Sequence, residues 1–423
     1  MRRLGRLIFT AALIIILALV TQRTWAGYAP YGLFRGLGVD FGDYWAQTMV
    51  LRMGDPTRLY DVQAVNEYLE LLRVYTPASD QSLLRLPTPY PPLFAWLFTP
   101  FTWPSPPTGF MLWTMLNIVG AVYLGWRLST LFPHLDGLTG TLLVLVSFPA
   151  LWALINGQVV LLLACAVTEG YLALRQERDF RAGLWLACLL LKPQYSLLLL
   201  PLLMVKRRWT ALTGVATGGA IIVIGSALFV GLPSLLTFPS AILLQSSTGN
   251  ISTTAPRVMI NWRALLFPFA SGLGEGTTLV LTLLLGLLTV LALIPIWRGR
   301  WFPRSPHFPV QMTLLWLATL LVSFHSHAHG AVLLTLPVAS ALAEGGLSRA
   351  SRIILLTTAY APTLYWLIFT FPRTYWAGVF NLFTGLLLLC FACLWYELVV
   401  RPQSADHDTA SPSSSVAPTA SLA

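Results

Sequence analysis

Long apolar runs dominate this chain, and short charged segments separate them. A helix rises about 1.5 Å per residue, so a run of about 20 apolar residues crosses the hydrocarbon core of a bilayer. We expect short, partial or tilted helices at 139–154, 158–174 and 330–343. The pattern predicts an all-α polytopic membrane protein with about 12 transmembrane helices, at 7–26, 88–104, 107–131, 139–154, 158–174, 182–204, 209–231, 277–297, 309–325, 330–343, 352–370 and 376–398.

Composition supports this class. Charged residues make up 10% of the 423 residues, against about 25% in soluble globular proteins. Hydrophobic residues make up 56%, and the mean hydropathy is +0.71. These values exclude a soluble enzyme, a disordered protein and a nucleic-acid-binding domain. The net charge of +10 comes from short loops rather than from a basic face.

Lysine and arginine predict the orientation. With twelve spans, most basic loops fall on one side, which the positive-inside rule assigns to the cytoplasm. The exception is RQERDFR (175–181), which falls on the outer side in this count. We expect a multi-pass plasma-membrane protein with both termini in the cytoplasm, whose first span is an uncleaved anchor. Residues 1–400 would form one membrane domain and 401–423 a disordered cytoplasmic tail.

Two outer loops, 27–89 and 233–276, are too long to be simple connections. In the first, 43–53 and 61–75 have apolar residues at helical spacing and predict amphipathic helices lying in the membrane interface. MGDPTRLYD (53–61) predicts a turn between them. A small lid without catalytic residues is an alternative for this loop.

Some polar groups interrupt the apolar runs, and an ionisable residue at membrane depth is a functional candidate by default. Lys192 lies inside LLLKPQYSLL, where Pro193 breaks the helix and Gln194 adds an amide. Lys192 could bind an anion, or it could snorkel or pair with a carboxylate such as Glu169. Asn156-Gly157-Gln158 is explained by a tight turn or by contact with a polar ligand.

Histidine and cysteine bear on metal binding. SFHSHAHG (323–330) contains three of the six histidines, but no carboxylate follows nearby in sequence. A hydrogen-bonding role near an anion fits at least as well as a metal site. The four cysteines lie in apolar runs and predict neither a disulfide nor a metal site. We therefore assign no metal and no cofactor, although dependence on a divalent metal stays open.

These features suit a substrate that is part lipid and part polar. A lipid-linked phosphosugar would place its tail among the spans, its phosphate near cations and its sugar on the outer face. A carboxylate in the first loop could deprotonate an acceptor hydroxyl. No Rossmann fingerprint or P-loop is present, which disfavours a soluble nucleotide-sugar donor.

Several motifs occur in an order that resembles a known family. They are VDFGDYW (39–45), GDPTRLYD (54–61), the YPP of TPYPPLFAWLFTP (88–100), NGQ (156–158), LKPQ (191–194) and HSHAHGAVLLTLP (325–337). Over roughly residues 30–340 the chain resembles glycosyltransferase family 87, the polyprenol-phosphate-mannose-dependent mannosyltransferases of the C-type glycosyltransferase superfold. The resemblance implies inverting transfer of a sugar from a polyprenyl phosphate.

The resemblance also implies site residues. Asp40 matches the catalytic aspartate of an Asp-apolar-x-x-Tyr pattern, and Asp43 is a second candidate that could instead be a helix N-cap. His327 and His329 match the late histidine motif, although Gly330 stands where an acid often follows. Charge and position suggest Lys192, Arg257 and Arg263 as phosphate ligands. The expected substrate contacts are Tyr44, Tyr90, Gln158, Gln194, His327 and His329.

A twelve-span transporter or lipid flippase is the alternative function, and a membrane scaffold is a third. Secondary transporters often contain two related halves, and no such repeat occurs here. The expected partners are a polyprenyl-phosphate sugar, a lipid or glycan acceptor and membrane lipid, with no nucleic acid. The sequence identifies neither the sugar, beyond mannose as the family default, nor the acceptor.

Overall fold

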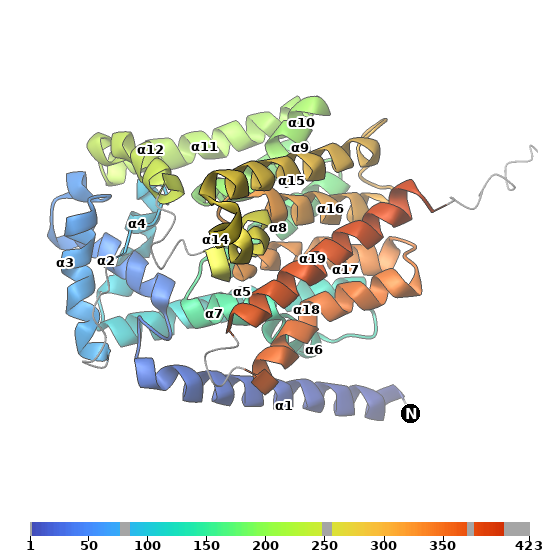
Figure 1. Cartoon of the computed structure of the whole chain (residues 1–423), viewed down its shortest axis with the longest axis horizontal. Coiled ribbons are helices and arrows are strands. Elements are labelled where there is room, and N and C mark those ends of the chain that lie inside the picture. The colour runs from blue at the N-terminus through green and yellow to red at the C-terminus, as the bar shows by residue number, and fades with distance from the viewer. Residues whose placement is uncertain (1, 77–84, 248–255, 370–375, 402–423) are drawn as a thin grey trace, which may run out of the picture.

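A computed structural model of the chain describes residues 2–76, 85–247, 256–369 and 376–401. It is 81% helical, and the described ranges contain no strand (Figure 1). The α-helices are α1 (Arg2–Tyr28), α2 (Val39–Met53), α3 (Val62–Leu71), α4 (Pro92–Phe98), α5 (Pro106–Leu131), α6 (Gly137–Val146), α7 (Phe148–Asn156), α8 (Val160–Arg175), α9 (Asp179–Leu186), α10 (Leu199–Val205), α11 (Trp209–Phe229), α12 (Leu232–Ser247), α13 (Trp262–Leu266), α14 (Ala270–Leu273), α15 (Glu275–Ile296), α16 (Phe308–Val322), α17 (Thr335–Glu344), α18 (Arg349–Phe369) and α19 (Trp376–Val399).

Among the described residues, six helices are long and apolar enough to cross a membrane: α1, α5, α11, α15, α18 and α19. The pair α6 and α7, bent by 71° at Ser147, adds a seventh if it is counted as one span. The prediction of an all-α polytopic membrane protein is confirmed, but a count of twelve spans is not.

The predicted span 88–104 is wrong. The chain there forms only the seven-residue α4 and a 3₁₀ turn, Thr99–Thr102. Prolines lack a backbone N–H donor, and their repetition at 89, 91, 92, 100 and 104 prevents a long helix. Instead α4 packs on α2 and α11, where the backbone N–H of Leu93 donates to Ser226 Oγ at 3.1 Å.

Shorter helices form three hairpins whose turns line the same cavity. The first turn joins α7 to α8 at residues 157–159, and the third follows α16 at residues 323–327. The second lies at Lys192, between the 3₁₀ helices Ala187–Leu191 and Pro193–Ser196 that follow α9 and precede α10. The predicted span 182–204 is therefore a hairpin that folds back at Lys192, where Pro193 prevents the helix from continuing.

The opposite ends of these hairpins meet at what we call the basic end, formed by residues 175–181, 206–208 and 298–304. Arg175 pairs with Glu344 at 2.7 Å. Glu177 pairs with Arg304 at 3.2 Å, and Asp179 pairs with Arg208. Figure 1 shows the N-terminus and the end of α19 at the right, far from α2 and α3 at the left.

The prediction that 175–181 lies opposite the other basic loops is therefore wrong. Two errors of the sequence interpretation put this loop on the wrong side. Residues 88–104 do not cross the membrane, which moves 175–181 to the other side. Residues 182–204 turn back, which leaves the loop 206–208 on the side where it was predicted. With both corrected, RQERDFR joins the loops at 206–208 and 298–304. The exception to the positive-inside pattern disappears.

Of the two helices predicted in the first long loop, α3 fits its prediction better than α2. Val65, Leu69 and Leu72 are buried on one side of α3 and its 3₁₀ extension, Leu72–Tyr75. In the turn 53–61, the Asp61 carboxylate caps α3 by accepting from the N–H of Ala64 at 2.7 Å. By contrast, α2 begins at Val39 and buries 9 of its 15 residues, so it is a core helix rather than a helix with one apolar face.

The second long loop, 233–276, is helical over α12, α13 and α14, and it returns to the third hairpin turn. Asn261 caps α13 and donates to the carbonyl of Ser323 at 2.8 Å. The N–H of Ile260 donates to the carbonyl of Ser326 at 2.9 Å. Nearly all of the predicted tail, 402–423, lies outside the described residues.

Candidate functional site

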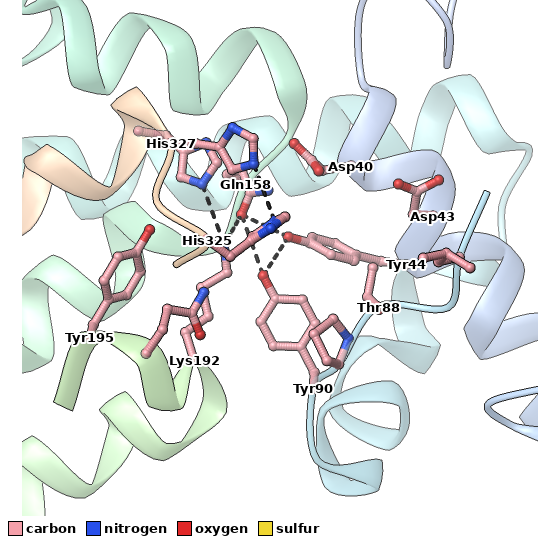
Figure 2. Close-up of a pocket in the computed structure, with 14 residues that line it drawn as sticks. Asp40, Asp43, Tyr44, Thr88, Tyr90, Gln158, Lys192, Tyr195, His325 and His327 are labelled. Carbon is pink, nitrogen blue, oxygen red and sulfur yellow. Dashed lines mark hydrogen bonds between the residues drawn. The ribbon is translucent and has the colours of Figure 1, made fainter. Parts of the chain in front are cut away.

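A cavity with about 570 Å³ of empty space, part of it open to the outside, contains most of the predicted site residues. Its walls come from α2, from the extended segment 85–91 and from the three hairpin turns. The residues that line it are Asp40, Asp43, Tyr44, Leu86, Thr88, Pro89, Tyr90, Gln158, Lys192, Gln194, Tyr195, His325, His327 and His329. Figure 2 shows the two aspartates on one side and Lys192 on the other.

Asp40 lies in the first turn of α2. The helix starts after Gly38, whose φ of +70° is in the left-handed region, and the Gly38 N–H donates to the Ile155 carbonyl at 2.8 Å. The Asp40 side chain stays partly exposed to the cavity. Burial raises the pKa of Asp40 above its ordinary value, while the charge of Lys192 and a hydrogen bond with Gln158 oppose this shift.

Asp43 is buried and forms an ion pair. Arg85 Nη1 donates to its carboxylate at 2.8 Å, and both side chains are buried. Burial raises the pKa of Asp43 to about 7, against the attraction of Arg85. The N-cap alternative for Asp43 is wrong, because α2 begins four residues earlier.

The extended segment 85–91 forms a wall of the cavity and is held by two amide side chains. Asn66 of α3 donates to the Arg85 carbonyl at 2.8 Å and accepts from the Arg85 N–H at 2.9 Å. Gln47 of α2 pairs in the same way with the backbone of Thr88. This attachment places the Tyr90 ring at the cavity, with its hydroxyl 2.9 Å from that of Tyr44.

Gln158 lies between the carboxylate and the cation (Figure 2). Its Oε1 accepts from Lys192 Nζ at 2.7 Å and from the Tyr44 hydroxyl at 2.8 Å. The preceding Gly157 adopts φ +73°, and a Cβ there would lie 2.7 Å from Cβ of Phe41. The turn therefore requires glycine, and it places Gln158 in the cavity. Both explanations of the NGQ motif, a tight turn and a polar contact, have a structural basis.

Lys192 is buried and reaches the cavity from the second hairpin turn. Besides Gln158, its Nζ lies 3.4 Å from His329 Nε2 and 5.4 Å from the centre of the Tyr90 ring. The alternative in which Lys192 pairs with Glu169 is wrong. Glu169 instead binds Arg127 and Arg181.

The third turn brings His325, His327 and His329 to the cavity. His327 Nδ1 lies 3.2 Å from the Val258 carbonyl, which can only accept, so this nitrogen carries the proton. His327 Nε2 then accepts from His325 Nε2 at 3.2 Å. Burial lowers the pKa of His327 to about 4, so its ring is neutral near pH 7. Within the described ranges, His329 Nδ1 is buried and has no hydrogen-bond partner.

The other predicted phosphate ligands do not line the cavity. The Arg263 guanidinium lies 4.3 Å from the centre of the Phe324 ring, just beyond the histidine turn. Arg257 lies in a 3₁₀ turn, Pro256–Val258, and its side chain is outside the described part of the structure. In the described ranges, no group of three or more His, Cys, Asp or Glu side chains is placed to hold a metal ion.

Sequence reasoning did not select three residues that the structure adds to the site. Arg85 stood alone in a leucine-rich stretch, and its charge was a signal. Tyr195 follows the LKPQ motif directly and is buried at the cavity wall. His325 belonged to the histidine cluster but was not assigned a role. Its hydrogen bond with His327 can be seen only in the folded chain.

Comparison with protein families adds independent evidence. Residues 88–324 match the model of glycosyltransferase family 87, which is 237 of the 423 residues. The chain belongs to glycosyltransferase family 87. The comparisons with curated proteins and with solved structures found no match.

Membership in family 87 makes the chain a glycosyltransferase, and its apolar helices indicate that it is embedded in a membrane. It favours the enzyme over the transporter or flippase. The matched region contains Tyr90, Gln158 and Lys192, whereas Asp40 precedes it and His325 follows directly after it.

Proposed function

We propose that the protein transfers a hexose, with mannose as the first candidate, from a polyprenyl-phosphate sugar to a hydroxyl of a lipid or glycan acceptor. One observation carries this proposal. A carboxylate, Asp40, and an ammonium group, Lys192, face the same cavity from different elements, with the Gln158 amide between them. Transfer of a sugar from a phosphate needs a base on one side of the reacting carbon and positive charge on the other.

Asp40 would act as the general base. In the proposed step, its carboxylate takes the proton of the acceptor hydroxyl while the hydroxyl oxygen bonds to the anomeric carbon. The bond from that carbon to the phosphate oxygen breaks, and the polyprenyl phosphate leaves with the electron pair. Attack from the side opposite the phosphate inverts the anomeric centre. A positioned base of this kind contributes about 10²–10⁴-fold to the rate.

Lys192 would stabilise the charge that develops on the departing phosphate. Fixed positive charge in a site that excludes water is more effective than in bulk solvent. The Lys192 ammonium group can only donate, so in their 3.4 Å contact His329 Nε2 accepts and Nδ1 of the neutral ring carries the proton. This Nδ1–H has no partner in the described structure and could contribute a hydrogen bond to the phosphate. Arg263, beside the histidine turn, and Arg257 are further candidates for binding the phosphate or the outer part of the donor.

The basic end would face the cytoplasm and the cavity the outer side of the plasma membrane. Helix α8 runs from the cavity to the basic end over 16 residues, or about 24 Å. The cavity therefore lies near the side opposite the basic loops, and exposed apolar side chains on α11 and α15 offer surface to lipid tails. A polyprenyl donor could reach the cavity from the outer leaflet.

Purified protein incubated with a panel of polyprenyl-phosphate sugars and acceptor alcohols tests this proposal. We expect transfer from at least one such donor, with an inverted anomeric centre in the product. Asp40→Asn should abolish transfer while donor binding persists, because the amide cannot accept the proton but keeps the shape of the side chain. Retained turnover in Asp40→Asn would refute Asp40 as the base, and transfer from nucleotide sugars alone would refute the donor class.

A further inference from the structure

The Gln158 side chain makes several polar contacts with other side chains of the protein. Its Oε1 accepts from Lys192 at 2.7 Å and from Tyr44 at 2.8 Å, and the Tyr90 hydroxyl lies 3.4 Å away. With the oxygen occupied in this way, the NH₂ group is the part of the amide that is left to donate. The Asp40 carboxylate lines the same cavity, and Gln158 is one of the groups that lower its pKa.

The backbone around Gln158 holds the amide in place. Its own N–H donates to the Ala153 carbonyl at 2.8 Å, and the Trp113 indole donates to the Gly157 carbonyl at 2.7 Å. The Gln158 side chain is 4% exposed. The amide is thus a fixed spacer and not a mobile group at the cavity surface.

A spacer matters because the two groups that it separates attract each other strongly. Opposite charges in a buried site interact much more strongly than in water. No ion pair joins Asp40 and Lys192 directly within the described structure, although the charge of Lys192 is near enough to lower the pKa of Asp40. A direct pair would make Asp40 a weaker base and would neutralise Lys192 before a phosphate arrives.

We propose that Gln158 is a positioning residue that keeps Asp40 and Lys192 from pairing directly. Its NH₂ group holds the carboxylate and its oxygen holds the ammonium group, so each charge stays available for a different part of the substrate. Asp40 is left for the acceptor hydroxyl and Lys192 for the donor phosphate. This inference rests on the proposed function, because it assigns the two charges to the two halves of that reaction.

Phosphate binding provides a test that does not depend on turnover. The probe is a short-chain polyprenyl phosphate, without sugar, titrated against the full chain in detergent micelles. Gln158→Ala should weaken binding about tenfold, because Asp40 then neutralises Lys192. In Gln158→Ala with Asp40→Asn, no carboxylate remains to pair with Lys192. Binding should then return to within about twofold of the Asp40→Asn single variant.

This double variant separates pairing from simple damage to the site. A structural defect caused by Gln158→Ala would persist when Asp40 is also replaced. Wild-type affinity in Gln158→Ala, or no recovery in the double variant, would overturn the inference. Gln158→Met fills a similar volume without the amide and provides the same comparison if the alanine variant does not fold.

The pH profile gives a second readout. A direct pair with Lys192 lowers the pKa of Asp40, so the acid limb of kcat/KM in Gln158→Ala should move to lower pH as the rate falls. An unchanged acid limb would contradict the proposal. The titratable and charged groups that face Asp40 from the surrounding elements are Asp43 and Tyr44 on α2, Arg85 and Tyr90 on the extended segment, Lys192 and Tyr195 at the second turn, and His325, His327 and His329 at the third.

Asn156→Ala is the matched control. The Asn156 amide lies two residues away in the same turn but donates to the Trp152 carbonyl at 2.8 Å, within its own helix. We expect wild-type phosphate affinity and an unchanged acid limb in this variant. Full turnover in Asp40→Asn would defeat the proposed function. A dead Asp40→Asn beside an unaffected Gln158→Ala would defeat only this inference.

Discussion

Arg85 donates a hydrogen bond of 2.8 Å to Asp43, and both side chains are buried. The same guanidinium donates to the carbonyls of Val39 at 2.9 Å and Phe34 at 2.8 Å. Arg85 therefore ties the extended segment to the start of α2, one turn from Asp40. The pair gives the second aspartate, which lies near the proposed base, a structural role in the fold.

Replacing Arg85 should be strongly destabilising. Arg85→Met leaves Asp43 buried without its partner, which costs about 3–5 kcal/mol in comparable buried pairs. Denaturant unfolding in detergent micelles measures the loss. Arg73→Met is the control, because Arg73 and Glu70 form an exposed pair worth less than about 1 kcal/mol. Equal losses in the two variants would show that the Arg85–Asp43 pair contributes no more than a surface contact.

Replacing Lys192 should affect both the rate and its pH dependence. Lys192→Met removes the charge beside the donor phosphate, and we expect a loss of about 10²–10³ in kcat. Because the Lys192 charge lowers the pKa of Asp40, the acid limb should also move to higher pH. Lys206 is the other lysine of the chain, at the basic end, where it donates to the Gly299 carbonyl at 2.8 Å. Lys206→Met should keep the acid limb in place, and a shared shift would argue against a local effect of Lys192.

The wild-type pH profile follows from Asp40 itself. A general base works only when ionised, and burial places the pKa of Asp40 above its ordinary 3.8. The value of kcat/KM should therefore fall as the pH drops through a limb that lies above 3.8. Initial rates across a buffered series measure this limb. A profile that stays flat down to about pH 4 would mean that a group other than Asp40 accepts the proton.

Gly330 should not tolerate a side chain. A Cβ at Gly330 would lie 2.3 Å from the Tyr195 hydroxyl oxygen and 2.7 Å from its ring carbon Cζ. Gly330→Ala must therefore displace the cavity wall, at a cost of about 1–3 kcal/mol and with reduced transfer. Gly385 on α19 has open space around its Cα, so Gly385→Ala should be neutral or stabilising by up to about 1 kcal/mol. Normal stability and turnover in Gly330→Ala would show that Tyr195 moves freely.

The position of loop 175–181 can be checked by labelling. Single cysteines at Arg178, Arg207 and Arg298, all exposed or partly exposed, should react with a membrane-impermeant reagent from the same side. A cysteine at Arg58 or Arg73, near α3, should react from the opposite side. Labelling of positions 178 and 207 from different sides would return the chain to the arrangement that we rejected.

Much of this fold could be predicted from the sequence because apolar length decides where a helix can cross a bilayer. Helices α1, α5, α11, α15, α18 and α19 were predicted close to their observed bounds. The two wrongly predicted spans, 88–104 and 182–204, lie in apolar runs whose hydrophobic pattern does not show where the helix ends. A single window of leucines at 182–204 cannot show that the chain reverses at Lys192, and only Pro193 hinted at it.

The sequence allowed most residues of the candidate site to be predicted, but not how they are arranged in space. Lys192 and Gln158 were selected because polar groups that interrupt apolar runs are costly and therefore informative. Asp40 was selected because it matches the Asp-apolar-x-x-Tyr pattern of the family that the chain resembles. Their grouping depends on contacts between segments far apart in sequence. The pairing of Asp43 with Arg85, 42 residues later, had no local signal in the sequence.

The three hairpin turns have a consequence for how the substrate specificity of such a protein can change. Each hairpin enters from the basic end and returns to it, so residues added to or removed from one turn leave the direction of every other helix as it was. The sequence of one turn can thus change independently of the other two. Substitutions can replace Gln158, Lys192 or the histidines separately. The sugar or the acceptor that fits the cavity could change while the path of the chain through the bilayer stays the same.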